Sequence, residues 1–237
     1  ARLRVAGPAS IEWWARRLKD AGVKASAAQE VDGRLTLMFE DPEGQRLALV
    51  DDGGVGDAHP WERSPVPAEH QIRGLGPITM SVPDLTATDT VLTSFMNMRA
   101  ARRYAAPHDP SVEIQVYEMG AGGPAAELHV AVEPSLPRAR QGRGAVHHVA
   151  FRTPDYTEYD AWAKRLAHLG IPNSGKVDRF YFRSLYFREP NGILFEIATD
   201  GPGFHSDEPI ETMGERLALP PFLEGRRREI EAGLKPL

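Results

Sequence analysis

The sequence contains no cysteine among its 237 residues, which excludes disulfide bonds and thiolate metal sites. It also has no apolar run near the roughly 18 residues that a membrane-spanning helix needs. Positive charge is not in excess, because 28 Lys and Arg face 33 Asp and Glu for a net charge of −5, which argues against a nucleic-acid or membrane-surface partner. With 41% hydrophobic residues, we expect a soluble, cytoplasmic, globular protein.

An initiator methionine and a signal peptide are also absent from the start of the chain. The segment Arg2–Val5, directly after Ala1, already has the character of a strand. We therefore expect that the sequence begins within a longer protein. Glycine and proline, in contrast, are abundant: 22 Gly and 20 Pro exceed their usual combined share of roughly 12%. Many turns joining short strands are therefore predicted.

An internal repeat divides the chain into similar segments. Residues 13–50 align without a gap on residues 161–198, at a constant offset of 148. In each copy, apolar residues at helical spacing predict one buried helix face, and a glycine ends the helix. Strand-forming runs and a turn with Pro and Gly follow, so the repeated module is a strand, a helix and three strands. The identical pairs are Trp14/Trp162, Ala15/Ala163, Arg17/Arg165, Leu18/Leu166, Gly22/Gly170, Phe39/Phe187, Pro42/Pro190 and Gly44/Gly192.

A third, weaker copy lies between these two. It has a predicted strand at Ile78–Val82, a helix at Val91–Met98 and strands at Val112–Glu118 and Glu127–Val132. We predict an α+β fold of repeated βαβββ modules that pair into curved mixed-sheet half-barrels, and an odd number of modules indicates that a first one is absent. The predicted parts are a second module at 1–52, a Pro-rich linker at 53–74, a third module at 75–134, a fourth at 143–201 and a tail at 202–237 with a helix from about 223 to 234.

Two residues of the last module form a candidate metal site. In a strand predicted from Val146 to Phe151, side chains alternate between faces, which places His148 on the face of Ala150. In the closing strand, Phe195 and Ile197 need the face that packs on the helix, so Glu196 points to the opposite, concave face. A histidine and a carboxylate on one face are half of a metal site, and this donor pair suits Fe, Mn, Ni or Zn.

The other copies lack both residues. Glu196 aligns with Ala48, so the fold itself does not require an acid at that position. His148 aligns with the position before Ala1, and in the middle copy it aligns with Pro77, which cannot bind a metal. Only the last copy therefore carries the candidate site.

Structural interpretations compete with this one. A strand histidine is often a hydrogen-bonded structural residue, and an inward Glu196 could pair with Arg179 or Arg183. His147 lies on the other strand face, where a structural role is favoured. Alternation puts Tyr186 on the face of Glu196, and a Tyr and an Arg beside a metal can donate to a developing oxyanion. We interpret as structural Trp13, Trp14, Glu127, His129 and Arg226–Arg228.

These residues carry a resemblance to a known family. The repeated module, with His148 on its first strand and Glu196 four residues after the turn that ends in Gly192, resembles the vicinal-oxygen-chelate superfamily of glyoxalases, extradiol dioxygenases and antibiotic-resistance binding proteins. More narrowly, the chain is similar to the subgroup of hydroquinone ring-cleaving dioxygenases. The segments that carry this similarity are Ser64–His70, Gly144–Phe151 and the run from Asp178 through Glu196 to Phe204.

The resemblance implies a non-haem Fe(II) enzyme that cleaves hydroquinone-type rings and incorporates both atoms of O2. The implied metal ligands are His148 and Glu196, and a further His is expected from a segment preceding Ala1. The implied catalytic residues are His147, Arg179 and Tyr186. The expected partners are a small aromatic substrate and O2, and whether the protein forms a homo-oligomer is left open.

Two other functions fit the same fold. A glyoxalase-like isomerase or lyase with Ni or Zn would need a second carboxylate ligand from a partner module. For that role, the other visible modules have only Ala48 or an isolated Glu127. In a metal-free binding or resistance protein, His148 and Glu196 would only line a ligand pocket. Fold alone does not decide among these functions.

Overall fold

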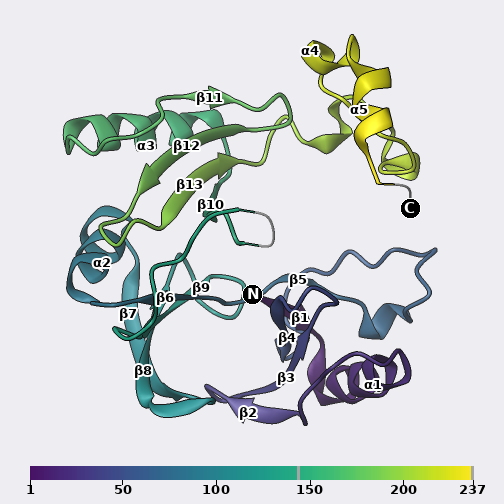
Figure 1. The fold of residues 1–237 in the computed structure, drawn as a ribbon, viewed down its shortest axis with the longest axis vertical. Coiled ribbons are helices and arrows are strands. Elements are labelled where there is room, and N and C mark those ends of the chain that lie inside the picture. Colours follow the sequence, from purple (N-terminus) through teal and green to yellow (C-terminus); the bar gives the residue numbers. More distant parts are fainter. Residues whose placement is uncertain (143–144, 236–237) are drawn as a thin grey trace. The chain divides into compact units, whose positions relative to one another are not determined.

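The computed structural model describes residues 1–142 and 145–235 (Figure 1). The chain forms two compact units, Ala1–Val146 and His147–Leu237. The first unit holds two sheets and the second unit holds one, and each sheet mixes parallel and antiparallel pairs. The predicted α+β fold is confirmed, whereas the numbering of the modules as second to fourth stays a prediction.

The N-terminal module of the first unit is built around one helix that crosses between parallel strands. Its sheet has the order β2-β3-β4-β1-β5, with β1 parallel to β4 and antiparallel to β5. Ile11 and Leu18 of the helix are buried against the sheet, and Trp14 packs partly on the same core, as the apolar stripe predicts. The elements are β1 (Arg2–Val5), α1 (Gly7–Asp20), β2 (Gln29–Val31), β3 (Arg34–Glu40), β4 (Arg46–Asp51) and β5 (Gly74–Leu75).

The middle module has the sheet order β6-β9-β8-β7. Its helix begins at Thr86, earlier than predicted, and ends in a π-helical turn at Phe95, where Leu92 and Phe95 are buried. The elements are β6 (Ile78–Val82), α2 (Thr86–Thr90), η2 (Val91–Phe95), β7 (Arg99–Ala106), β8 (Asp109–Glu118) and β9 (Glu127–Val132). Strand β7 has no counterpart in the sequence prediction.

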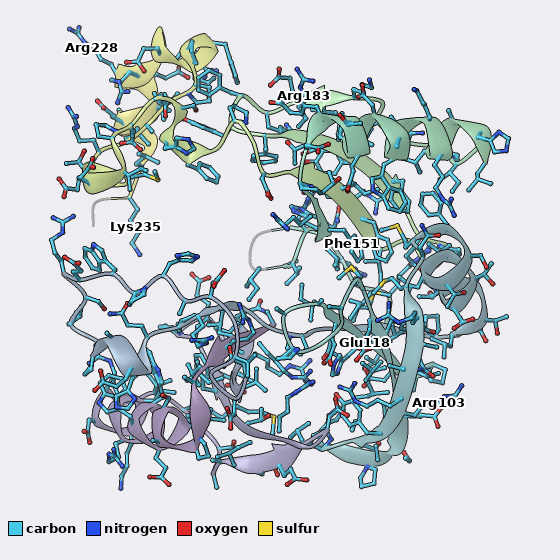
Figure 2. All side chains as sticks on the ribbon, turned by 180° about the vertical axis from the view of Figure 1, so that it is seen from behind. Arg103, Glu118, Phe151, Arg183, Arg228 and Lys235 are labelled. Carbon is cyan, nitrogen blue, oxygen red and sulfur yellow. The ribbon has the colours of Figure 1, made fainter. Side chains whose placement is uncertain are left out.

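The second unit carries the last module, with the sheet order β10-β13-β12-β11. Tyr159 and Leu166 of its helix are fully buried, as are Phe195 and Ile197 of β13, whereas Trp162 is half-buried. Figure 2 shows Phe151 on β10 and Arg183 on β12 from the side opposite to Figure 1. The elements are β10 (Val149–Thr153), α3 (Tyr156–His168), β11 (Val177–Asp178), β12 (Arg183–Arg188) and β13 (Leu194–Thr199).

The prediction that β10 includes His147 and His148 was wrong. The strand begins at Val149, which pairs with Phe195 of the parallel strand β13. Strand β13 itself begins only at Leu194, because the turn that ends in Gly192 precedes it. The two histidines therefore lie outside the strand, directly before β10.

The predicted linker packs on the N-terminal module. Its short helix η1 (Ala68–His70) contacts α1, since Trp14 Nε1 donates to the His70 carbonyl at 2.7 Å and Ser10 Oγ donates to the Glu69 carbonyl at 3.0 Å. Strand β5 spans the predicted boundary between the linker and the third module, and it extends the sheet at β1. The region is proline-rich, yet this part of it is an ordered piece of the first unit.

The described part of the tail, residues 202–235, contains four short helical elements rather than the one long helix predicted near its end. The predicted helix from about Leu223 to Leu234 is interrupted at Gly225 and Arg226. The elements are η3 (Phe204–Ser206), η4 (Ile210–Thr212), α4 (Pro221–Glu224) and α5 (Arg227–Gly233). In the part of the chain that the structure describes, every helix is too short or too polar to cross a membrane.

Candidate functional site

The second unit brings His148 and Glu196 together. Glu196 lies on β13 opposite Ala150 of the parallel strand β10, and His148, two residues before Ala150, reaches the same sheet face. His148 Nε2 lies 2.8 Å from Glu196 Oε2. The Glu196 side chain is 4% exposed and the His148 side chain 35% exposed, so the carboxylate is buried while the imidazole borders solvent.

The other oxygen of Glu196 accepts two hydroxyl groups from β12. Ser184 Oγ donates to Oε1 at 2.5 Å, and the Tyr186 hydroxyl donates to the same oxygen at 2.8 Å. Tyr186 and Glu196 are register partners, so strand alternation places both hydroxyls on the face of the carboxylate. Oε1 is thus held by the protein, and Oε2 is left facing His148.

Arg179 and His147 extend this arrangement at its two ends. Arg179 Nε donates to the Tyr186 hydroxyl at 3.3 Å, and its guanidinium carbon lies 5.2 Å from the centre of the tyrosine ring. His147 Nδ1 lies 3.1 Å from His148 Nδ1. The structure therefore joins all five residues singled out in the sequence, in the order His147, His148, Glu196, Tyr186 and Arg179, while their roles stay predictions.

The structural alternative for Glu196 is not what the structure shows. In the described part of the chain, its ion-pair partner is His148 rather than Arg179 or Arg183. Arg183 instead lies over the ring of Tyr156, at 4.0 Å from its centre. The buried carboxylate therefore faces an imidazole nitrogen rather than a guanidinium group.

Ser184 shares the face of Tyr186 by strand alternation, but no sequence feature indicated a role for it in the site. It is fully buried, and its hydroxyl makes the shortest contact to Glu196. The available signal was its place two residues before Tyr186, which alternation assigns to the same face. A small polar residue at a buried strand position needs a hydrogen-bond partner, and the facing carboxylate supplies it.

The donor set fits a divalent transition metal. One imidazole nitrogen and one carboxylate oxygen lie close together, and a mixed nitrogen and oxygen set suits Fe, Mn, Ni or Zn. Within residues 1–142 and 145–235, no third His, Asp or Glu completes a group of ligand atoms here within 4.8 Å of one another. The described chain thus offers two candidate ligands for such an ion, His148 and Glu196.

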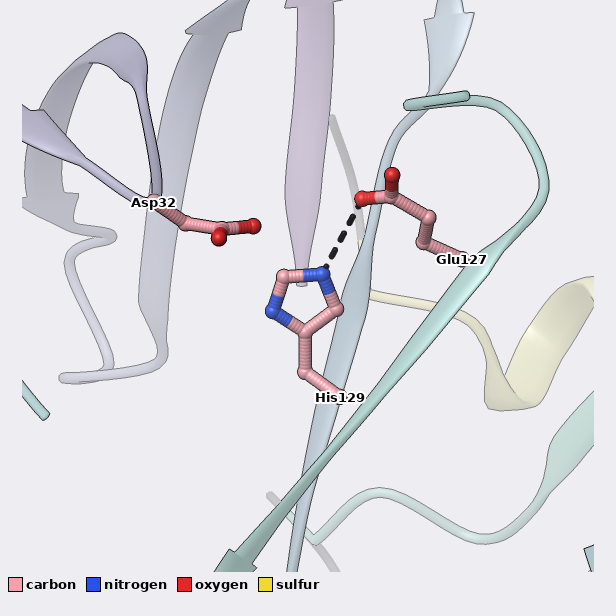
Figure 3. A group of neighbouring side chains, drawn as sticks. All are labelled: Asp32, Glu127 and His129. Atoms are coloured by element: carbon pink, nitrogen blue, oxygen red, sulfur yellow. Dashed lines mark hydrogen bonds and ion pairs between the residues drawn. The ribbon is translucent and has the colours of Figure 1, made fainter. Parts of the chain in front are cut away.

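A second cluster, in the first unit, has ligand spacing of its own (Figure 3). Asp32 lies between β2 and β3, Glu127 and His129 lie on β9, and their ligand atoms are all within 4.8 Å of one another. The interpretation of Glu127 as isolated was wrong, because it forms ion pairs with Arg34 and Arg102. These contacts join residues that are far apart in the sequence, so no local sequence pattern predicts them.

Comparisons with known proteins agree on one family. The family model described as "Glyoxalase/Bleomycin resistance protein/Dioxygenase superfamily" matches residues 74–197. The chain is 45% identical over 236 residues to "Putative ring-cleaving dioxygenase MhqA" of Bacillus subtilis (strain 168), covering 99% of this chain and 74% of the relative. It is 31% identical over 225 residues to "Chlorohydroquinone/hydroquinone 1,2-dioxygenase" of Sphingobium indicum, covering 93% of this chain and 68% of the relative.

Solved structures show the same likeness. A crystal structure of a "putative dioxygenase" from Bacillus subtilis superposes with a TM-score of 0.86 at 33% identity, covering 99% of this chain and 72% of that chain. Glyoxalase I from Zea mays superposes with a TM-score of 0.56 at 17% identity, covering 84% of this chain and 67% of that chain. The second likeness shows the fold alone.

Proposed function

Since the chain belongs to the Glyoxalase/Bleomycin resistance protein/Dioxygenase superfamily, we propose that it is a non-haem Fe(II)-dependent ring-cleaving dioxygenase acting on hydroquinone-type aromatic compounds. The observation that carries this proposal is the 2.8 Å approach of His148 Nε2 to Glu196 Oε2, while the other carboxylate oxygen is held by two hydroxyls. The names of the relatives MhqA and chlorohydroquinone/hydroquinone 1,2-dioxygenase support the reaction class and the substrate class.

His148 and Glu196 would hold the iron, together with a histidine from a segment preceding Ala1. Iron held by these residues would supply Lewis-acid and redox chemistry for the reaction of a ring hydroxyl group with O2. The hydroxyls of Ser184 and Tyr186 fix the carboxylate through Oε1, so that Oε2 is presented as a single ligand atom.

Metal binding by His148 would fix which ring nitrogen carries the proton in His148 and in His147. When His148 Nε2 acts as a ligand it is unprotonated, so the proton of that ring lies on Nδ1 and is donated to His147 Nδ1 at 3.1 Å. A neutral His147 then carries its own proton on Nε2. His147 is exposed, and in the proposed mechanism its Nε2–H donates to a substrate oxygen or passes a proton.

Tyr186 and Arg179 form the opposite side of the proposed site. The Tyr186 hydroxyl donates to Glu196 and accepts from Arg179. If its O–H turns from Glu196 toward a developing oxyanion, it would donate a hydrogen bond there while the guanidinium stabilises the charge. Arg179 is itself exposed and always charged, which suits it to attract the anionic form of a ring hydroxyl.

Oxygen-18 labelling tests this proposal. The full-length protein, loaded with Fe(II) without air, is mixed with hydroquinone and labelled O2, and the product is analysed by mass spectrometry. We expect a ring-opened product that carries both labelled atoms. A glyoxalase-like isomerase or lyase would leave O2 unconsumed, and a metal-free binding protein would retain hydroquinone unchanged whether iron is present or not.

A further inference from the structure

The cluster of Asp32, Glu127 and His129 in the first unit resembles a metal site in its geometry. All three ligand atoms lie within 4.8 Å of one another, and the residue types match those of the proposed centre in the second unit (Figure 3). Glu127 and His129 are both buried. By spacing alone, a divalent cation could be expected among them.

The position of His129 matches that of Glu196. In the last module, Ala150 of the first strand pairs with Glu196 of the closing strand, and in the middle module Thr79 pairs with His129 in the same parallel register. The cluster thus lies where a module of this fold presents a ligand from its closing strand. It is a counterpart, within the first unit, of the His148 and Glu196 pair.

Arginine side chains occupy this counterpart. Arg102 NH2 donates to Asp32 Oδ2 at 2.5 Å and to Glu127 Oε1 at 3.0 Å, which places its charge between the two carboxylates. Arg34 donates to both oxygens of Glu127, at 2.7 and 2.8 Å. Every carboxylate oxygen that a cation would use is thus already bound to a guanidinium nitrogen.

Both nitrogens of His129 are occupied as well. Its Nδ1 accepts from Arg2 NH1 at 3.0 Å and from the Tyr104 hydroxyl at 2.9 Å, so the proton of a neutral ring lies on Nε2 and is donated to Glu127 at 3.1 Å. Burial lowers the pKa of His129, which keeps the ring neutral.

The charges of the cluster oppose a further cation. The three carboxylates of Asp32, Glu127 and Glu118 face the three guanidinium groups of Arg2, Arg34 and Arg102, so the negative charges of the cluster are already balanced. A divalent ion would add two more positive charges in a region of low dielectric constant, where repulsion is strong. With Arg102 in place, metal binding is therefore disfavoured.

We propose that this cluster is a closed counterpart of the His148 and Glu196 centre, in which the Arg102 guanidinium takes the place of a divalent cation. The Arg102 guanidinium also joins two sheets of the first unit. Arg102 lies on β7, and it binds Asp32, which lies next to β3 of the neighbouring sheet. Because Arg34 also covers both oxygens of Glu127, removal of the Arg34 and Arg102 guanidinium groups together leaves two carboxylates and an imidazole with ligand spacing, and this opened cluster binds a divalent cation.

Cobalt titration of full-length protein tests the proposal. The variants His148→Ala and Glu196→Ala are combined first, so that the proposed centre of the second unit cannot bind metal. Arg34→Met is added to this parent protein, because Arg34 covers both oxygens of Glu127. This parent protein is expected to bind no Co(II), as read from visible absorption and metal content after gel filtration. Adding Arg102→Met, which keeps a long apolar stem without charge, is expected to produce one bound Co(II) per chain. Adding His129→Ala to that protein is expected to remove it.

Arg102→Lys is the matched control, because it retains a positive charge, and it is expected to bind no Co(II). Circular dichroism checks that each variant is folded, and Arg102→Gln replaces Arg102→Met if the latter is not. Binding of Co(II) by the parent protein that is lost in His129→Ala would overturn the proposal. A folded Arg102→Met and a folded Arg102→Gln that both bind no Co(II) would overturn it as well.

Discussion

Replacing Ser184 by alanine removes one of the two hydroxyls that hold the Glu196 carboxylate. Both residues are buried, and the Ser184 Oγ to Glu196 Oε1 distance is 2.5 Å. A hydrogen bond to a charged group contributes about 1.5–3 kcal/mol, and we expect the free energy of unfolding to fall by about that amount. Tyr186 continues to donate to the same oxygen, so the fold is retained.

The larger effect of Ser184→Ala is expected on metal retention. Groups that orient a metal ligand typically change metal affinity or activity by about 10–100-fold, and Ser184 orients the carboxylate so that Oε2 faces His148. Ser184 is fully buried and cannot touch a substrate. We therefore expect iron affinity and kcat to fall together, with little change in KM for hydroquinone.

The measurement compares iron content after dialysis against a chelator with urea unfolding of the iron-free protein. Ser174→Ala is the matched control, because Ser174 Oγ accepts from the backbone of Tyr186 and does not contact Glu196. Ser184→Thr keeps a hydroxyl and should keep iron better than alanine does. Unchanged iron affinity in Ser184→Ala, beside the expected loss of stability, would refute the orienting role and leave a structural one.

The remaining predictions concern a hydroxyl, a buried histidine and the metal. Tyr186→Phe keeps the ring beneath Arg179 and removes the hydroxyl on Glu196, so kcat should fall by about 10–100-fold in oxygen uptake, with KM nearly unchanged. Burial lowers the pKa of His129 from 6.5, so the unfolded chain binds more protons than the folded one below that pH. Stability should therefore fall with pH below about 6.5, by up to about 1.4 kcal/mol per pH unit, and a smaller slope is expected in urea unfolding of His129→Gln. Dialysis against a chelator should abolish ring cleavage, Fe(II) should restore it, and persistent activity without metal would contradict the proposed function.

Much of the fold follows from sequence periodicity. The apolar stripes of α1 and α3 and the glycines that end them were found directly, and Gly22 and Gly170 have the positive φ angles of 70° and 64° that helix ends favour. Strand β7 was missed because its residues are mostly Arg and Ala and are largely exposed. Arg102 and Tyr104 of this strand serve the polar cluster, so they do not show the apolar alternation of an ordinary strand.

The candidate site was predictable where strand alternation applies. Glu196 and Tyr186 share a sheet face because they are register partners on β13 and β12. The apolar residues next to each of them predict which face that is, since those residues must point to the core. The placement of His148 within a strand was wrong, since the partner strand begins too late to pair with it. The arginine-filled cluster was beyond local patterns, because Arg102 and Asp32 are 70 residues apart and meet only through tertiary packing.

Glu196→Ala tests the central claim most directly, namely that His148 and Glu196 hold the iron of a ring-cleaving dioxygenase. Alanine is what the N-terminal module carries at the matching position, Ala48, so the fold should survive the change. The buried Ser184 hydroxyl loses its acceptor, which should lower stability by about 1–3 kcal/mol.

Oxygen uptake with hydroquinone is measured in full-length Glu196→Ala beside the wild type, together with iron content and Tm. Asp200→Asn is the control, because it removes a carboxylate of the same unit that pairs with Arg152 outside the site. The account predicts that Glu196→Ala loses both iron and oxygen uptake while remaining folded, and that the control keeps both. Unchanged iron-dependent oxygen uptake in folded Glu196→Ala would contradict the account.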